Sequence, residues 1–279
     1  MDPLVDTSWL AERLGEPWLR VADVRWYLSP ERNGREEYAR GHVPGAIFLD
    51  VDTDLSAPGG RPGALCGRHP WPDAAQVARV MSGAGIGTGT CVVAYDDAGG
   101  GIAARLWYLL RAHGHDDAAV LDGGIVKWIA EGRPLDSGVP RVEPAVFHGE
   151  LRPGFVVTKQ EMVRTHRDRL VLDARAPERY RGDLEPIDPR PGHVPGAASA
   201  PFSDNLEPGP VPVFRPPEQL RATYAALGAA AREPVVYCGS GVTACCDLLA
   251  LERAGLKGRL YAGSWSEWSA DPSLPAERG

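Results

Sequence analysis

The segment Gly41–Ala46, with the sequence GHVPGA, recurs letter for letter as Gly192–Ala197, 151 residues further along the chain. Chance identity over six positions is implausible. The flanking segments correspond in the same order, Asp23–Arg25 with Asp173–Arg175 and Val92–Asp96 with Val235–Cys238. Two copies of one domain are the simplest interpretation of this repeat.

Within each copy, short apolar runs alternate with longer segments of helical periodicity. In the first copy the pattern predicts strands at Leu19–Val24, Cys91–Tyr95 and Ala118–Leu121, and helices at Ala74–Met81 and Ala103–Ala112. Such alternation is typical of an α/β fold with a largely parallel sheet flanked by helices. We therefore expect two tandem α/β domains, residues 1–136 and 155–279, joined by a Pro- and Gly-rich linker at 137–154.

The composition is that of an ordinary globular protein, with 43% hydrophobic and 24% charged residues among 279. A net charge of -7 argues against a broad electrostatic surface for nucleic acid or anionic lipid. No segment is apolar for the ~18 residues that a membrane span requires, and Met1–Leu10 lacks the pattern of a signal peptide. We expect a cytoplasmic protein that binds neither nucleic acid nor a membrane.

The five cysteines form no CxxC pair, and their odd number leaves at least one thiol without an intramolecular partner. Free thiols fit a reducing compartment. The spacing of His and Cys indicates no metal site. The glycine-rich run Gly83–Gly89 precedes a predicted strand instead of opening a helix, so it is interpreted as a turn and not as a dinucleotide loop. We therefore expect no cofactor, and the cysteines are considered as reactive thiols instead of as a disulfide framework.

The strongest chemical signal is Cys238, which follows the apolar run Val235–Tyr237 and precedes a glycine-rich loop and a helical pattern. Gly239 and Gly241 permit backbone conformations that are closed to other residues, so the loop can curl around the sulfur. Inward N–H groups and the N-terminus of the next helix then favour the thiolate. The alternative is an inert buried cysteine at a strand end. The glycines on both sides of Ser240 favour the reactive interpretation.

The paired GHVPGA segments, the loop CGSGVTA and the segment Gly263–Trp268 together resemble the tandem-domain rhodaneses, and the loop resembles that of their 3-mercaptopyruvate sulfurtransferase branch. The resemblance implies one active site, in the C-terminal domain, which carries sulfur as a persulfide on Cys238. It also implies that the loop residues contact the substrate, namely Gly239, Gly241, Val242 and Thr243. Asp96 occupies the matching position of the first copy. Because a carboxylate cannot carry sulfane sulfur, the N-terminal domain is expected to be catalytically silent.

The resemblance further implies a donor. Thiosulfate-preferring members have a CRKGVT loop whose cations suit a dianion, whereas this chain has Gly239 and Ser240 at those positions. This predicts a preference for 3-mercaptopyruvate, with thiosulfate as the alternative donor. Arg179 and Arg190 match the family's two substrate arginines, and arginine suits a carboxylate because its planar fork donates twice. Arg181 is the alternative to Arg190, and a solvated surface charge is the alternative for each.

The resemblance also implies a proton relay in which Asp52 and His69 of the N-terminal domain approach Ser240. Without the resemblance, His69 would be interpreted as a surface loop residue. In the implied cycle, the Cys238 thiolate attacks the sulfur of 3-mercaptopyruvate, and pyruvate leaves. An acceptor then takes the outer sulfur, and the expected acceptors are cyanide, small thiols or thioredoxin.

Two other functions fit the sequence less well. A cysteine phosphatase on a related fold needs an arginine six positions after the cysteine, where this chain has Ala244. A rhodanese-like binding module without catalysis would have no need of Cys238 and its glycine loop. The histidines of the two GHVPGA segments, His42 and His193, occur in the silent and the catalytic copy alike, so both are predicted to be structural.

Overall fold

The computed structural model describes all 279 residues, which divide into two compact units. Unit 1 comprises Met1–Leu55, Pro72–Arg152 and Glu207–Phe214, and unit 2 comprises Ser56–Trp71, Pro153–Leu206 and Arg215–Gly279. Each unit therefore combines most of one half of the chain with a short segment of the other half. These two short pieces, Ser56–Trp71 in unit 2 and Glu207–Phe214 in unit 1, are called the exchanged segments. Their first residues, Ser56 and Glu207, are separated by the same 151 residues as the two GHVPGA segments, so they begin at corresponding points of the repeat.

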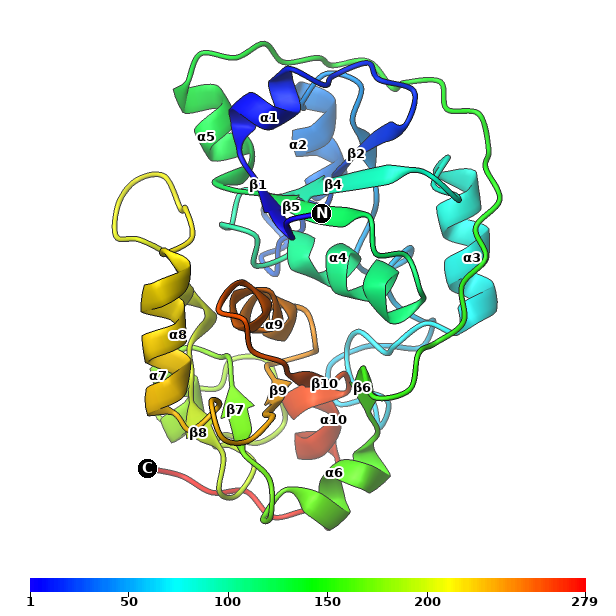
Figure 1. The fold of residues 1–279 in the computed structure, drawn as a ribbon. Coiled ribbons are helices and arrows are strands. Elements are labelled where there is room, and N and C mark those ends of the chain that lie inside the picture. Colours follow the sequence, from blue (N-terminus) through cyan, green and yellow to red (C-terminus); the bar gives the residue numbers. More distant parts are fainter. The chain divides into compact units, whose positions relative to one another are not determined.

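Unit 1 is an α/β fold around one parallel sheet. Its elements are β1 (Leu4–Val5), α1 (Thr7–Ala11), β2 (Leu19–Asp23), α2 (Gly34–Arg40), β3 (Ile47–Phe48), α3 (Ala74–Gly83), β4 (Cys91–Tyr95), α4 (Ala103–Ala112), β5 (Ala118–Leu121) and α5 (Gly124–Ala130). The strand order is β1-β5-β4-β2-β3, and every pairing is parallel (Figure 1). The predicted strands and helices are all present.

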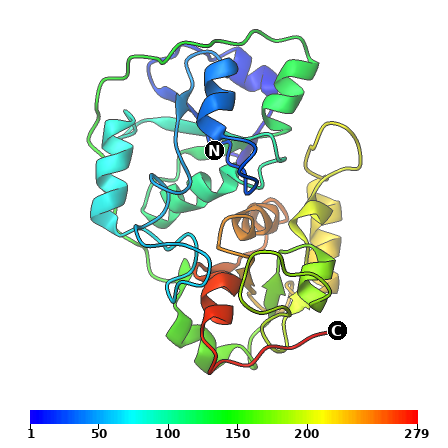
Figure 2. The same cartoon turned by 180° about the vertical axis from the view of Figure 1, so that it is seen from behind.

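Unit 2 repeats this architecture. Its elements are β6 (Val156–Val157), α6 (Lys159–Thr165), β7 (Val171–Asp173), α7 (Pro177–Arg181), β8 (Ala198–Ser199), the 3-10 helix η1 (Phe202–Asn205), α8 (Pro217–Ala226), β9 (Val235–Tyr237), α9 (Ala244–Arg253), β10 (Arg259–Tyr261) and α10 (Ser264–Ala270). The parallel strand order β6-β10-β9-β7-β8 matches that of unit 1. Figure 2 shows the same ribbon from the opposite side. The predicted fold class, two tandem domains with parallel sheets flanked by helices, is confirmed.

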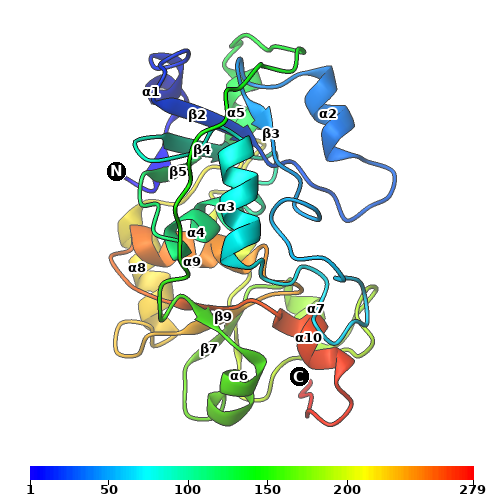
Figure 3. The same ribbon diagram turned by 90° about the vertical axis from the view of Figure 1, so that its right-hand side faces the viewer.

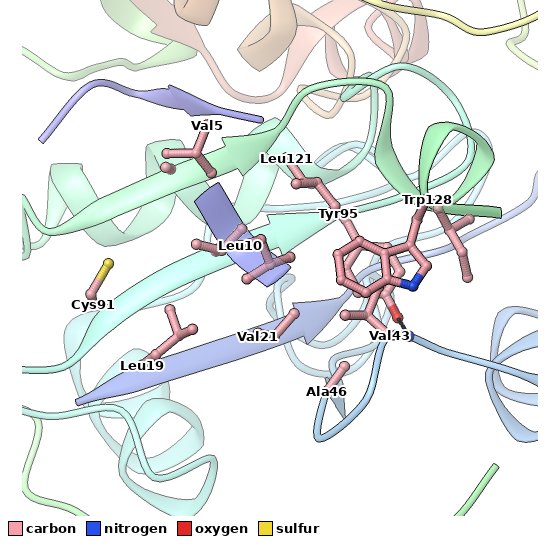
Figure 4. Packing of buried hydrophobic residues seen from close by; sticks show 13 residues of the cluster. Val5, Leu10, Leu19, Val21, Val43, Ala46, Cys91, Tyr95, Leu121 and Trp128 are labelled. Atoms are coloured by element: carbon pink, nitrogen blue, oxygen red, sulfur yellow. Dashed lines mark hydrogen bonds between the residues drawn. The ribbon is translucent and has the colours of Figure 1, made fainter. Parts of the chain in front are cut away.

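The cores of the two units are built in the same way. In unit 1, Leu10 of α1 and Trp128 of α5 pack on the strand residues Val21 and Tyr95, and all four side chains are buried (Figure 4). Burial of apolar area at roughly 25 cal/mol per Å² is the main stabilising contribution of such a cluster. The Trp128 indole N–H donates to the carbonyl of Pro134 at 2.7 Å, so its burial leaves no polar group unpaired.

The connection between the halves lies along unit 1, beside α3 (Figure 3). The N–H of Ala145 donates to the carbonyl of Ser82 at 2.9 Å, and the N–H of Phe147 donates to the Ser82 hydroxyl at 3.0 Å. The N–H of Arg152 donates to the carbonyl of Ala112, at the end of α4, at 2.7 Å. This Pro- and Gly-rich stretch, predicted as a linker, is therefore fixed to the C-terminal ends of two helices of unit 1.

The histidines of the two GHVPGA segments pack alike. The His42 ring stacks on Tyr38 with a centroid distance of 3.9 Å, and its Nδ1 lies 2.8 Å from the Tyr38 carbonyl oxygen. His193 stacks on Tyr180 at the same two distances. Both rings are buried. These contacts support the structural role predicted for the two histidines.

Candidate active site

Cys238 follows the carboxyl end of β9, at the start of the loop that leads into α9. The residue is only 2% exposed, and its Sγ accepts a hydrogen bond from the Gly241 N–H at 3.1 Å. Gly241 has a φ of +77°, and a Cβ added there would lie 2.3 Å from the carbonyl oxygen of Ala262. Glycine is required at this position by backbone conformation and by space. The loop therefore closes around the sulfur, as its glycine pattern predicts.

Ser264, at the start of α10, fixes the backbone of Cys238 through a hydrogen bond, although sequence analysis did not single it out. Its Oγ accepts a hydrogen bond from the Cys238 N–H at 3.1 Å and donates to the carbonyl of Tyr261 at 2.9 Å. Ser264 has a φ of +55°, and no other non-glycine residue of the chain has a positive φ. Gly124, at φ +52°, begins the corresponding helix of unit 1. Unit 2 thus keeps a strained serine where unit 1 has glycine.

Two replacements of Ser264 distinguish the effect of its hydrogen bond from the effect of its strained backbone. Ser264→Ala removes the hydroxyl but keeps the strained backbone, so we expect about a tenfold loss of kcat/KM and a loss of about 1 kcal/mol in the free energy of unfolding. Ser264→Gly also lacks the hydroxyl, but glycine tolerates a positive φ, so the stability should recover while the activity does not. Initial rates and urea unfolding measure both effects. Full activity of the alanine variant would contradict this positioning role.

Ser240 and His69 meet next to the cysteine loop. The Ser240 Oγ lies 2.7 Å from the His69 Nδ1, and the two residues are 6% and 4% exposed. His69 belongs to the exchanged segment Ser56–Trp71, so it is part of unit 2 although the N-terminal half of the chain supplies it. Asp52 belongs to unit 1, and its Oδ2 accepts a hydrogen bond from the Trp26 indole N–H at 3.0 Å. The contribution of Asp52 to a relay stays a prediction.

The other predicted loop residues complete the turn into α9. Val242 is buried, and its carbonyl accepts a hydrogen bond from the Cys245 N–H at 3.0 Å. Thr243 precedes the first residue of α9, and its carbonyl accepts from the Cys246 N–H at 3.0 Å. These contacts begin the helix directly after the cysteine loop, so the N-terminal end of α9 is fixed to that loop.

Two guanidinium groups lie beside Gly239. A Cβ added to Gly239 would lie 2.6 Å from Nη2 of Arg68 and 3.4 Å from Nη1 of Arg179. A side chain at position 239 would therefore have to displace the Arg68 guanidinium group from its present place. Arg179 was predicted, whereas Arg68 was missed. Its position next to His69 in a long loop was the only signal that the sequence offered.

Both guanidinium groups are paired with carboxylates of the chain. Nη2 of Arg179 donates to Glu185 at 2.7 Å and to Asp188 at 3.1 Å. Arg68 forms an ion pair with the other oxygen of Asp188. The side chains of Arg68 and Arg179 are only 8% and 16% exposed. Arg175, whose side chain is 1% exposed, also pairs with Glu185 at 3.3 Å and with Asp173 at 2.6 Å. The region beside Gly239 is therefore a buried cluster of three cations and three anions.

Arg190 lies in a different environment. Its Nε, Nη1 and Nη2 donate to the carbonyls of Trp268, Ser269, Asp271 and Leu274 at 2.8 to 3.1 Å. These carbonyls lie in α10 or just beyond its C-terminal end, so the guanidinium group braces that helix. Arg181 forms a surface ion pair with Asp183 at 2.8 Å. Arg68, and neither Arg190 nor Arg181, accompanies Arg179 at Gly239.

The matching loop of unit 1 closes on Asp96, which is completely buried. Its carboxylate accepts four backbone hydrogen bonds of 2.7 to 2.9 Å, from the N–H groups of Ala98, Gly100, Ile102 and Ala103. Burial raises the pKa of this carboxyl group, and the four N–H groups act in the opposite direction. Four inward N–H groups of the unit 1 loop thus surround a carboxylate of the chain, whereas in the matching loop of unit 2 the Gly241 N–H donates to the Cys238 sulfur.

Fold and site together define an α/β protein of two tandem copies, with a buried cysteine at the centre of a glycine-rich loop in the second copy. The family model described as "Rhodanese-like domain" matches residues 6–131 and 158–271. The chain belongs to the rhodanese family and contains two tandem rhodanese-like domains.

Relatives match over nearly the whole chain. A Pseudomonas aeruginosa protein described as "Probable 3-mercaptopyruvate sulfurtransferase" is 44% identical over 282 residues, which cover 99% of this chain and 98% of that protein. Human 3-mercaptopyruvate sulfurtransferase is 36% identical over 95% of this chain and 91% of its own. Mouse thiosulfate sulfurtransferase is 36% identical over 99% and 95%. The solved 3-mercaptopyruvate sulfurtransferase from Leishmania major is 32% identical with a TM-score of 0.84, and the match covers 95% of this chain and 74% of that one.

Proposed function

We propose that this protein is a sulfurtransferase that moves sulfane sulfur from 3-mercaptopyruvate to a thiol or to cyanide through a persulfide on Cys238. The observation that carries the proposal is the glycine loop closed around the Cys238 Sγ, with the Gly241 N–H donating to it at 3.1 Å. An N–H group in this position stabilises a negatively charged sulfur in the reacting state. Relatives named for this activity, matched along nearly the whole chain, support the same function.

In the proposed cycle, the Cys238 thiolate attacks the sulfur of the donor. An S–S bond forms while the donor's C–S bond breaks, and its electron pair leaves with the enolate of pyruvate. Ser240 and His69 accept the thiol proton of the donor and return a proton to the enolate carbon, which yields pyruvate. Their contact of 2.7 Å supports this assignment, and Asp52 remains the predicted third member of the relay. The acceptor thiolate or cyanide then takes the outer sulfur, and the Cys238 thiolate is restored.

Arg179 and Arg68 bind the donor carboxylate in this proposal, with Gly239, Gly241, Val242 and Thr243 forming the floor of the site. Arg68 takes the role predicted for Arg190, because its guanidinium group lies beside Gly239, whereas that of Arg190 donates to carbonyls at the end of α10. Thiosulfate is the alternative donor, because the mouse relative is named for transfer from thiosulfate. A domain that only binds partners would not require the loop geometry around Cys238.

Replacement of Arg179 by alanine tests the donor site. We expect KM for 3-mercaptopyruvate to rise about tenfold or more, because the donor carboxylate loses a charged hydrogen-bond donor worth about 1.5 to 3 kcal/mol. Initial rates with 3-mercaptopyruvate and with thiosulfate, with cyanide as the common acceptor, provide the measurement. Arg181→Ala is the matched control, because this neighbouring arginine is 48% exposed and pairs on the surface.

Three results would contradict the proposed function. The first is a wild-type protein that transfers sulfur from neither donor. The second is the absence of one added sulfur atom in its mass after incubation with a donor. The third is a larger rise in KM for Arg181→Ala than for Arg179→Ala, which would place the donor elsewhere.

The cellular setting is also proposed. Five free cysteines, without a disulfide, suit a reducing compartment, so we propose the cytoplasm as the location and thioredoxin or small thiols as the cellular acceptors. No helix of the structure has both the length and the apolar character needed to cross a membrane. The N-terminal domain, with Asp96 in its loop, is proposed to be catalytically silent.

A further inference from the structure

The charge beside Gly239 does not come from the loop alone. Judged by its loop residues, the site lacks the cations that suit a dianionic donor. The structure places Nη2 of Arg68 at 2.6 Å from the position that a Cβ of residue 239 would occupy. Arg68 therefore brings a cation to the loop from a distant segment. The donor's preferred charge must then depend on what this cation is paired with.

Asp188 is the partner of both guanidinium groups. One of its oxygens pairs with Arg68, and the other accepts a hydrogen bond from Arg179 at 3.1 Å. Its side chain is 0% exposed, and its own N–H donates to Glu185 at 3.0 Å, which fixes its position. Burial raises the pKa of Asp188, while the charge of Arg68 acts in the opposite direction. Asp188 thus binds the two cations as the carboxylate of a donor would.

The charges of this cluster cancel. Arg68, Arg175 and Arg179 contribute three positive charges, and the carboxylates that pair with them, Asp173, Glu185 and Asp188, contribute three negative ones. The Nε of Arg68 is buried and has no hydrogen-bond partner, so this guanidinium group keeps one unsatisfied donor. The cluster thus presents two guanidinium groups beside Gly239 without a net positive charge.

We propose that Asp188 determines the charge preference of the sulfur donor, by cancelling one of the two positive charges beside Gly239. A dianion such as thiosulfate gains twice the Coulomb energy of a monocarboxylate from each added positive charge. With Asp188 ionised, the cluster offers no such gain, so the monoanionic 3-mercaptopyruvate is favoured. This inference rests on the proposed function, since it concerns the donor of that same reaction.

Asp188→Asn provides the test, because it removes one negative charge at nearly constant shape. The ratio of kcat/KM for thiosulfate to that for 3-mercaptopyruvate should rise about tenfold, equivalent to about 1.4 kcal/mol. Asp183→Asn is the matched control. It removes the same charge from the same stretch of chain, but Asp183 is 58% exposed and pairs with Arg181 on the surface. Its ratio should stay within about twofold of the wild type.

Arg68→Gln is expected to change this ratio of kcat/KM values in the opposite direction. It also provides an independent variant if Asp188→Asn fails to fold. It leaves the cluster with two cations and three anions, so the ratio should fall. A ratio that stays within twofold in the folded variants, or that falls in Asp188→Asn, would overturn the inference. These results are distinguishable from failure of the proposed function, because in that case the wild-type protein itself would transfer no sulfur from either donor.

Discussion

Replacement of Cys238 by serine is expected to lower sulfur transfer by at least about 10³-fold while the protein remains folded. A serine hydroxyl cannot form a persulfide, so the first half of the cycle is lost. The fold should tolerate the change because serine is smaller than cysteine and its Oγ can accept the hydrogen bond that the Gly241 N–H gives to Sγ. Thiocyanate formation from 3-mercaptopyruvate and cyanide measures the activity, and urea unfolding measures the stability.

Cys66→Ser is the matched control for this replacement. Cys66 is an exposed free cysteine on the same exchanged segment as His69, and the proposed cycle does not use it. It should keep the wild-type rate and still gain one sulfur atom in mass when treated with donor. Appreciable turnover by Cys238→Ser, or loss of the added sulfur in Cys66→Ser, would mean that another group carries the sulfur.

Replacement of Asp96 by alanine is expected to lower the free energy of unfolding by roughly 4 kcal/mol. Four backbone N–H groups would lose their acceptor in a fully buried loop, and water would replace only part of those hydrogen bonds. The activity of the molecules that remain folded should change little, because the proposed cycle uses no group of that loop. Urea unfolding, together with rates measured well below the unfolding transition, separates the two effects.

Asp97→Ala is the neighbouring control for this prediction. Asp97 is partly exposed and accepts hydrogen bonds from Tyr27 and Arg32 near the surface, so its loss should cost about 1 kcal/mol. An Asp96→Ala variant as stable as the wild type would contradict the role of the carboxylate in closing the loop. A folded Asp96→Ala variant without activity would contradict the proposal that the first domain is silent.

The architecture could be predicted because its determinants are local. Strands such as Cys91–Tyr95 are short apolar runs, helices such as Ala103–Ala112 follow the 3.6-residue period, and the repeat fixes the order of both. The position of Cys238 was predictable for the same reason, since a strand, a glycine loop and a helix follow one another without interruption. In each case the interacting groups lie close together in the sequence.

The remaining parts of the site depend on contacts between residues far apart in the sequence, which no local sequence pattern determines. The exchange of Ser56–Trp71 into unit 2, and with it the place of Arg68, follows from how a long loop packs. Arg190 was assigned by its place before a GHVPGA segment, but the direction of its long side chain depends on the carbonyls at the end of α10. Ser264 required a comparison of backbone angles between the two units, because a positive φ cannot be read from a serine.

The exchanged segment also sets an order of events during protein synthesis. His69 and Ser240 are 171 residues apart, so at about 5 to 20 residues per second the histidine leaves the ribosome roughly 10 to 30 s before its partner. The sheet of unit 1 can form in that interval, because its last strand in the sequence, β5, ends at Leu121. Ser56–Trp71 must wait, and during that time it is open to proteases and chaperones. A full-length chain that refolds from denaturant has no such delay, so nascent and refolding molecules should differ in how long this segment can be cleaved.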